Sequence, residues 1–338
     1  MENLVNVLEK ISKQYRKYDF ISATKNIIYH ILTRERKKSF GSLNPDKIFY
    51  VIRSIDFDSR FYIGPINNLL ANYFYVLTHL KYAEKNGWIP VVDQLNYPVY
   101  NSVNFPINES MNAWEYFWEQ PSLYNLEEVY SSQNVILSKQ NWFNEYDIGY
   151  SVEDHQNKNK IRGLNKVSKK IPLKKQTNEK INVLINGTFP DNKKILGVNF
   201  RFGGHSKKHY GCKAGHPVQP DVEELANIVM EKCEIWNMDY IFLASDTLEA
   251  VNVFRKIFKN KLIYLKRSRY SENIQKGEKN ILYLKDNIYN TSLEYLAEML
   301  LLSKCDGLIG SISSGFRYAL INNNNKYEHI EILDYGLY

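Results

Sequence analysis

The chain has 338 residues, 44% hydrophobic and 24% charged, which is typical of a globular protein long enough for two domains. Its three cysteines are widely spaced and odd in number, which excludes a disulfide framework and favours a reducing, cytoplasmic compartment. No apolar run approaches the roughly 20 residues of a transmembrane helix, and the formal net charge of +7 is compatible with a basic face that binds anions.

The first half of the chain predicts a strand, a helix and a second strand. An amphipathic helix at residues 1–20 comes before them and lacks the apolar core of a signal peptide. It packs on its own domain or lies on a membrane surface as a peripheral contact, and both alternatives stay open. The strand at 47–55, the helix at 64–86 and the strand at 89–93 form the unit of a parallel sheet covered by helices.

The middle of the chain is less regular. Residues 146–181 change to a polar and basic composition, and we place the connection between two domains there, with a helix at 179–186. A disordered linker is the alternative. The predicted domains are an N-terminal one at 1–180 and a C-terminal one at 181–338.

The second half alternates strands and helices. The strands are predicted at 194–200, 240–246, 261–265, 306–311 and 329–334, and the helices at 221–237, 248–258, 292–305 and 314–322. This alternation predicts a doubly wound α/β domain, in which ligands bind beyond the carboxyl ends of the strands.

Three of these strand ends carry unusual polar residues. Arg201 follows the strand at 194–200, Asp246 closes the strand at 240–246, and Ser313 and Ser314 come directly before a helix. A serine turn at a helix N-terminus offers unpaired N–H groups, and an arginine at a neighbouring strand end adds a fixed positive charge. Together they predict a diphosphate site, with an ordinary serine N-cap as the alternative.

Glu298 lies between apolar residues on the helix predicted at 292–305. A carboxylate in that position needs a partner. The two N–H donors at the edge of guanine are one such partner, and a glutamate at the solvent edge of the helix is the alternative.

The motifs GVNFRF with GHPVQP, then FLASD, then EYLAEMLLLSKCDGLIGSISSGFRYAL resemble a known family in order and spacing over roughly residues 195–322. It is the fucosyltransferase family of the protein O-fucosyltransferases, the core α1,6-fucosyltransferase, the rhizobial nodulation fucosyltransferase and related bacterial polysaccharide glycosyltransferases. The resemblance implies an α/β GT-B fold, two Rossmann-like domains facing a cleft, with residues 1–180 on the acceptor side and residues 181–338 binding the nucleotide sugar. It also implies an inverting, metal-independent transfer of a sugar, fucose among the candidates, from a GDP-sugar to a glycan, lipid-linked saccharide or protein. No metal and no cofactor are expected.

The same resemblance assigns roles to individual residues. Arg201 would clamp the diphosphate, Asp246 would support the nucleotide pocket, and Glu298 would read guanine. Ser313 and its neighbour Ser314 would bind phosphate through hydroxyl and backbone N–H groups.

The resemblance has two further consequences near the donor sugar. Gly64, before the first long helix, would let the backbone approach the donor from the other domain. Asn199 takes the place of the family's histidine in the nucleotide-sugar site.

The general base is the point at which this sequence departs from the family. No carboxylate lies between Arg201 and Pro220, although the family's motif often carries one there. His205 or His209 would then serve as the catalytic base, since the unperturbed pKa of histidine is near 6.5. Otherwise the N-terminal domain supplies the base, or the leaving diphosphate provides most of the driving force. A non-catalytic nucleotide-sugar or glycan-binding protein is the alternative from another class.

The same loop raises a metal alternative. His205, His209, Cys212 and His216 are spaced H-x3-H-x2-C-x3-H, and all four are side chains that bind zinc. The spacing is not that of a standard zinc finger, and the loop lies where the family holds its nucleotide sugar, so we predict no metal there. A nucleic-acid binder is supported by net charge alone and lacks an aromatic and basic platform.

Overall fold

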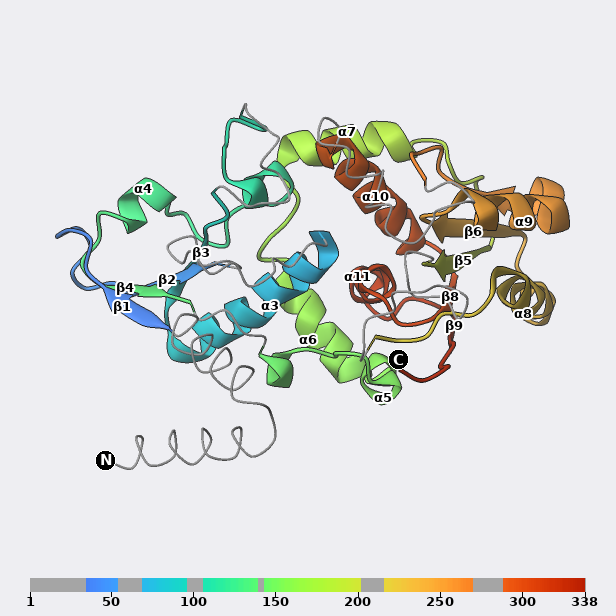
Figure 1. The fold of residues 1–338 in the computed structure, drawn as a ribbon, viewed down its shortest axis with the longest axis horizontal. Coiled ribbons are helices and arrows are strands. Elements are labelled where there is room, and N and C mark those ends of the chain that lie inside the picture. Colours follow the sequence, from blue (N-terminus) through green and yellow to red (C-terminus); the bar gives the residue numbers. More distant parts are fainter. Residues whose placement is uncertain are drawn as a thin grey trace, which may run out of the picture.

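The computed structural model describes residues 35–53, 69–95, 106–138, 143–201, 216–269 and 288–337. These residues form two β-sheets with helices around them (Figure 1). The first sheet has the strand order β1 (Arg36–Lys38), β4 (Val135–Leu137), β2 (Phe49–Ile52), β3 (Ile89–Val92). β2 is parallel to β3 and β4, and β1 is antiparallel to β4. The predicted parallel unit of the first half is therefore confirmed, whereas β1 and β4 were not predicted.

The second sheet is parallel throughout. Its strand order is β7 (Leu262–Ile263), β6 (Tyr240–Ser245), β5 (Ile195–Phe200), β8 (Gly307–Gly310), β9 (His329–Ile332). The chain winds outward from β5 through β6 to β7, returns to β8 beside β5, and then winds the other way to β9. This is the doubly wound order predicted from the sequence, and the winding direction reverses between β5 and β8.

The helices surround the two sheets. The α-helices are α3 (Leu69–Asn86), α4 (Leu126–Val129), α5 (Val152–Gln156), α6 (Lys158–Ser168), α7 (Lys175–Ile185), α8 (Val222–Ile235), α9 (Leu248–Phe258), α10 (Ile288–Leu302) and α11 (Ser314–Asn323). Short 3₁₀ helices lie at η2 (Ala113–Tyr116), η3 (Asn144–Tyr146) and η4 (Lys259–Lys261). None of the helices in the described part of the chain combines the length and hydropathy needed to cross a membrane.

Side chains that alternate along the strands of the second sheet build a core on each of its faces. Leu196 and Val198 of β5 pack with the core of α8 and α9, and Ile195 packs with the core of α10 and α11. Figure 1 shows the same division, with α8 and α9 on one side of the sheet and α10 and α11 on the other. The period of two along each strand explains why a continuous apolar run fills both faces.

The segment between the two sheets is folded. α5, α6 and α7 occupy it; α6 packs against α3 and α11, and α7 packs against α10. The alternative of a disordered linker at residues 146–181 is therefore wrong. The boundary predicted at residue 180 falls inside α7, and one core cluster contains side chains of both halves, including Tyr73 and Tyr318 with ring centroids 5.2 Å apart. The two-domain GT-B cleft stays a prediction.

Candidate functional site

The carboxyl ends of β5 and β8 meet at the point where the winding of the second sheet reverses. Asn199 of β5 is paired in register with Gly310 of β8. β5 leads into Arg201, and β8 leads into the turn that begins α11 at Ser314. Parallel strands end at the same edge, so the structure places Asn199, Arg201 and the serine turn at one switch point, where open α/β sheets bind ligands.

A hydrogen bond joins the two strand ends. The Ser313 hydroxyl donates to Asn199 Oδ1 at 2.8 Å and accepts from the backbone N–H of Phe316 at 3.1 Å. Ser313 is therefore the N-cap of α11, as the alternative reading held, and its hydroxyl is used within the protein. The phosphate contact predicted for this turn would then come from N–H groups of the first turn of α11 and from Ser314, because the first N–H groups of a helix have no intrahelical partner.

Glycines bring β8 and the start of α11 close to Asn199 of β5. A Cβ atom on Gly310 would lie 2.5 Å from the backbone oxygen of Asn199, and one on Gly315 would lie 2.5 Å from Met299 Sδ and 3.3 Å from Asn199 Nδ2. No side chain fits at either position without displacing a neighbour. The start of α11 is consequently held directly over Asn199 and α10.

Two polar groups at this edge are unused in the structure. Arg201 is partly exposed and has no hydrogen-bond or ion-pair partner among the described residues. Ser311, at the end of β8, is fully buried, and its hydroxyl has no partner there either. An unpaired buried hydroxyl costs about 1–3 kcal/mol. A ligand with acceptor oxygens at this edge would be bound by the Arg201 guanidinium and would offer the Ser311 hydroxyl a partner.

Glu298 has arginine partners that the sequence reasoning missed. Its Oε2 accepts from Arg267 Nε at 2.9 Å and Nη2 at 2.7 Å, and its Oε1 accepts from Arg269 Nη2 at 2.8 Å. The glutamate side chain is 0% exposed and the arginine side chains are 3% and 2% exposed, so the solvent-edge alternative is wrong. We call these three residues the arginine clasp. The signal in the sequence was KRSR at 266–269, directly after the strand predicted at 261–265.

The arginine clasp also holds the end of β6. Arg267 Nη2 donates to the backbone oxygen of Ser245 at 2.8 Å, and Arg269 Nε donates to the same oxygen at 3.0 Å. Asp246 is the next residue. Burial lowers the pKa of Arg267, but the charges of Glu298 and then Asp246 outweigh burial and raise it overall. Burial lowers the pKa of Arg269 despite the same glutamate.

These bonds compete with the role predicted for Glu298. A carboxylate offers about four acceptor positions, and the clasp uses three of them. The edge of guanine needs two. Reading guanine through Glu298 stays a prediction, and it requires one guanidinium bond to be exchanged for the base.

A second ionic cluster packs against α11 from the connecting segment. Arg317 donates through Nη2 to Asp147, and its guanidinium carbon lies 4.2 Å from the centroid of the Phe74 ring. His155 Nδ1 lies 2.7 Å from the backbone oxygen of Ser151 and donates to it, which leaves the buried Nε2 as an acceptor without a partner among the described residues. Burial lowers the pKa of His155 to about 4, so the ring is neutral at pH 7.

Several predicted residues lie outside the described ranges. They are Gly64, His205, His209 and Cys212. His216 is described, and its Nδ1 lies 3.4 Å from the hydroxyl of Tyr150. The described residues contain no group of three or more His, Cys, Asp and Glu side chains arranged to hold a metal ion, but most of the proposed zinc ligands are outside that part of the chain.

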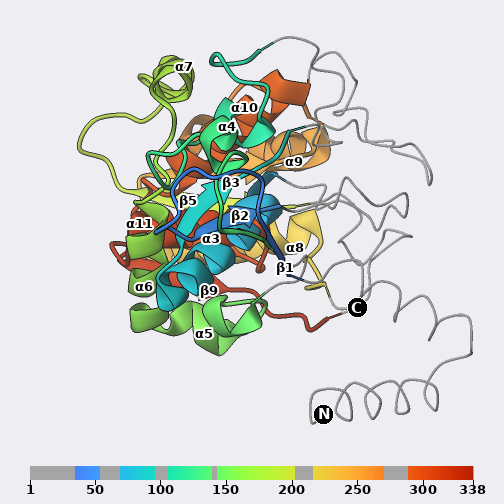
Figure 2. The ribbon, with the colours of Figure 1, turned by 90° about the vertical axis from the view of Figure 1, so that its left-hand side faces the viewer.

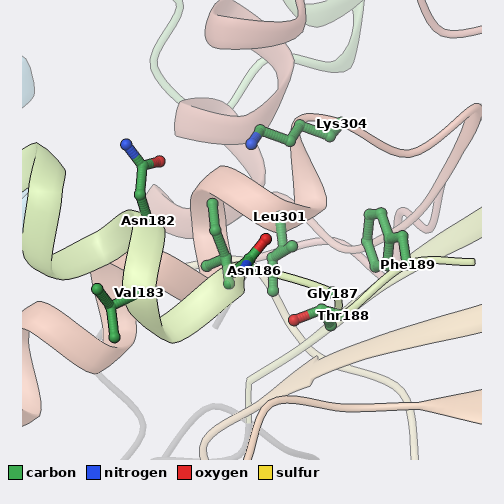
Figure 3. A pocket seen from close by; sticks show the side chains of 9 residues that line it. Asn182, Val183, Asn186, Gly187, Thr188, Phe189, Leu301 and Lys304 are labelled. Atoms are coloured by element: carbon green, nitrogen blue, oxygen red, sulfur yellow. The ribbon is translucent and has the colours of Figure 1, made fainter.

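A pocket of about 540 Å³ lies away from the switch point (Figure 3). It opens between α7 and α10, with Asn182, Asn186 and Lys304 among its polar side chains and Leu301 and Phe189 among its apolar ones. α10 ends here and leads into the amino end of β8. The pocket therefore lies at the edge opposite to the carboxyl ends of the strands, and it is not the predicted diphosphate site.

Comparison with solved structures finds fucosyltransferases. A structure of NodZ α-1,6-fucosyltransferase soaked with GDP-fucose is 14% identical, with 81% of this chain and 92% of that chain covered and a TM-score of 0.41. Fucosyltransferase NodZ from Bradyrhizobium is 15% identical with the same coverage and a TM-score of 0.42. POFUT1 in complex with GDP is 12% identical over 51% of this chain and 50% of that chain, with a TM-score of 0.32.

No family model and no curated protein matches the sequence. At these identities and TM-scores the solved structures assign no residue role to this chain. The NodZ structures are fucosyltransferases, which is the family that the sequence motifs resemble.

Proposed function

We propose that the protein is an inverting, metal-independent glycosyltransferase that moves a sugar, with fucose as the first candidate, from a GDP-sugar to a glycan, lipid-linked saccharide or protein. The observation that supports it is the switch point between β5 and β8. There Asn199 and Ser313 tie the strand ends together, the N-terminus of α11 faces the carboxyl edge, and Arg201 has no partner among the described residues.

The proposed chemistry stabilises the leaving group. Arg201 and the N–H groups at the start of α11 bind the diphosphate, and both stabilise the negative charge that develops as the bond between sugar and phosphate breaks. The close approach of Gly315 to α10 fixes the direction of the helix start. Donors that are held in place before the reaction need no reorganisation during it, and removing one such donor from an enzyme typically slows turnover by about 10²–10³-fold.

We propose that the proton acceptor is neither Glu298 of the arginine clasp nor Asp147. The carboxylate of Glu298 is bound to two arginines, and that of Asp147 is bound to Arg317. His205 and His209 stay the proposed catalytic bases. In the proposed GT-B arrangement they would meet an acceptor held by residues 1–180, with Gly64 near the donor.

The proposal is tested by nucleotide binding and donor hydrolysis. Thermal-shift measurements with GDP, UDP and their sugar conjugates should give stabilisation by GDP and GDP-sugars, because ligands that bind the folded state raise the melting temperature. Release of GDP from a GDP-sugar should then follow enzyme concentration. A chain stabilised by UDP and not by GDP would contradict the guanine preference.

A second function is favoured by the paired carboxylates. If no base is available, the protein binds a nucleotide sugar or glycan without transferring it. Stabilisation by GDP-sugars with no hydrolysis and no transfer, measured over several donors and acceptors, would select this alternative.

A further inference from the structure

Two segments of the chain are strongly basic: residues 158–180, and residues 255–269, which contain seven lysines and arginines and no acidic residue. Residues 158–180 contain nine lysines and arginines and one glutamate, a formal charge of +8. The whole chain has a formal charge of +7, so all other residues together sum to −1. The two segments differ in their partners, because Arg267 and Arg269 of the second segment are buried against Glu298.

α6 presents three of these charges in a row on one side. Lys158, Arg162 and Lys166 are spaced four residues apart, so they form a straight row along the helix, and all three are exposed. The opposite side carries Ile161 and Leu164, which are buried against the core. The basic side of α6 is therefore the side that no described element covers.

The row continues into a broader face. Lys169 and Lys170 follow α6, and Lys174, Lys175 and Lys180 lie on and before α7. In Figure 2 α6, α7 and the segment that joins them line the same edge of the molecule. We call the basic side chains of residues 158–180 on these elements the α6–α7 face.

Most of these charges are not neutralised within the protein. Lys160 pairs with Asp154, and Lys170 pairs with Glu84 at 2.9 Å. The other seven basic side chains of the α6–α7 face have no carboxylate within ion-pair distance among the described residues. A face of this kind attracts a polyanion of complementary charge.

The residue types indicate which polyanion. Eight of the nine basic residues are lysines, which act as hydrated point charges and not as the rigid forks that recognise individual phosphates. Residues 158–180 contain no aromatic side chain, although single-stranded nucleic acids are bound on aromatic platforms. Lysines spread over a broad face without such platforms match the diffuse negative charge of a lipid surface.

We propose that the α6–α7 face binds the surface of a lipid bilayer that contains anionic phospholipids. This goes beyond the proposed transferase activity and does not depend on it. The face is also distinct from the N-terminal helix at residues 1–20, for which a membrane contact was predicted from amphipathicity.

Vesicle co-sedimentation of the full chain tests the proposal. Vesicles of phosphatidylcholine with phosphatidylglycerol should bind the protein at low salt, and vesicles of phosphatidylcholine alone should not. Binding should be lost at about 1 M salt, where the screening length is roughly 3 Å. No binding to the anionic vesicles would overturn the proposal.

Charge reversal locates the surface. Lys158→Glu/Arg162→Glu/Lys166→Glu should weaken vesicle binding by roughly a hundredfold or more, because each basic residue near the surface contributes about a factor of five. The matched control reverses three exposed lysines on and after α9, as Lys256→Glu/Lys259→Glu/Lys261→Glu, and should retain most of the binding. Equal losses in the two variants would overturn the assignment to this face.

Two further experiments test whether the variants still fold and whether the bound polyanion is a lipid surface. Lys158→Gln/Arg162→Gln/Lys166→Gln removes the same charges without adding carboxylates, and it should weaken vesicle binding while GDP binding and the melting temperature stay unchanged. Tighter binding to heparin or RNA than to anionic vesicles, with the same dependence on the three residues, would replace the bilayer by another polyanion and overturn the proposal.

Discussion

Two neighbouring regions at the carboxyl edge of the second sheet use their polar groups in opposite ways. At the ends of β5 and β8, Arg201 and the buried hydroxyl of Ser311 have no partners among the described residues. At the end of β6, the two arginines of the arginine clasp donate hydrogen bonds to Glu298 and to the backbone oxygen of Ser245. The first region has binding capacity left for a ligand, and the second forms a rigid support beside it.

The hydrogen bonds of the arginine clasp explain how three charged side chains can be buried there. Three charged side chains buried to 3% exposure or less cost several kcal/mol per ion in desolvation, and only a full set of hydrogen bonds offsets that cost. In the clasp every guanidinium nitrogen donates a hydrogen bond, and both carboxylate oxygens of Glu298 accept. Among the residues that the structure describes, the groups without a partner at the switch point are a partly exposed arginine and the hydroxyl of one serine. The desolvation cost of these groups is smaller, and a ligand can remove it.

The largest expected effect comes from breaking the clasp. Glu298→Gln leaves two buried guanidinium groups without a countercharge, and it should lower the free energy of unfolding by about 3–5 kcal/mol. Denaturant titration measures this. Glu231→Gln, an exposed position on α8, is the matched control and should change stability by less than about 0.5 kcal/mol.

The same variant sharpens the comparison between support and binding. A loss of stability with an unchanged preference for GDP over UDP would mark Glu298 as part of the support. Loss of the preference for GDP would instead mean that Glu298 contacts guanine, as the family resemblance implies. A stability loss below about 1 kcal/mol would contradict the clasp.

Acid should destabilise the protein through His155. Its pKa is about 4 in the folded chain and about 6.5 in the unfolded chain, so between these values the unfolded state binds the proton and the folded state does not. Stability is highest above pH 6.5 and falls as the pH decreases towards 4, by about 3 kcal/mol from this group alone.

Charged neighbours also affect the pKa of His155, so the pH measurement needs a variant without this histidine as its control. Arg317 lowers its pKa further, and Asp147 and Asp154 raise it. His155→Phe removes the proton uptake, so unfolding free energies at pH 7 and pH 4.5 should differ less in the variant than in the wild type. Equal pH dependence in both chains would contradict a neutral, buried His155.

The smallest of these effects concerns the link across the switch point. Ser313→Ala removes both the N-cap of α11 and the bond to Asn199, and it should cost about 1 kcal/mol of stability. GDP affinity should fall with it, because the start of α11 is no longer fixed. Asn157→Ala at the N-cap of α6 removes the same kind of cap on a helix without predicted site residues and should leave GDP affinity unchanged. If GDP affinity changes equally in Ser313→Ala and in the control variant, the Ser313 cap contributes to stability and has no specific effect on GDP binding.

The alternation of strands and helices in the second half was predictable because each element carries its own period and its own stop signals. The helix predicted at 248–258 is observed with the same bounds as α9. β1 escaped prediction because its three residues, RKK, have neither apolar alternation nor β-branched side chains, and its place is set by pairing with β4.

The candidate site was predictable in part for a related reason. Asn199, Arg201 and Ser313 stand at strand ends that topology alone brings together. The arginine clasp was not predicted, because Glu298 lies 29 and 31 residues beyond its partners and only the fold decides that they meet. His155 and Arg317 were missed for the same reason, since α5 and α11 are far apart in the sequence.

The most direct test of a diphosphate site at the end of β5 is the affinity of GDP for the wild type and for Arg201→Ala, measured by isothermal titration calorimetry. Arg162→Ala, an exposed arginine on α6, serves as the control. Losing charge-assisted bonds to the diphosphate should weaken binding by roughly 10–100-fold in Arg201→Ala and leave the control unchanged. GDP binding of equal strength in all three proteins would contradict a diphosphate site at the end of β5.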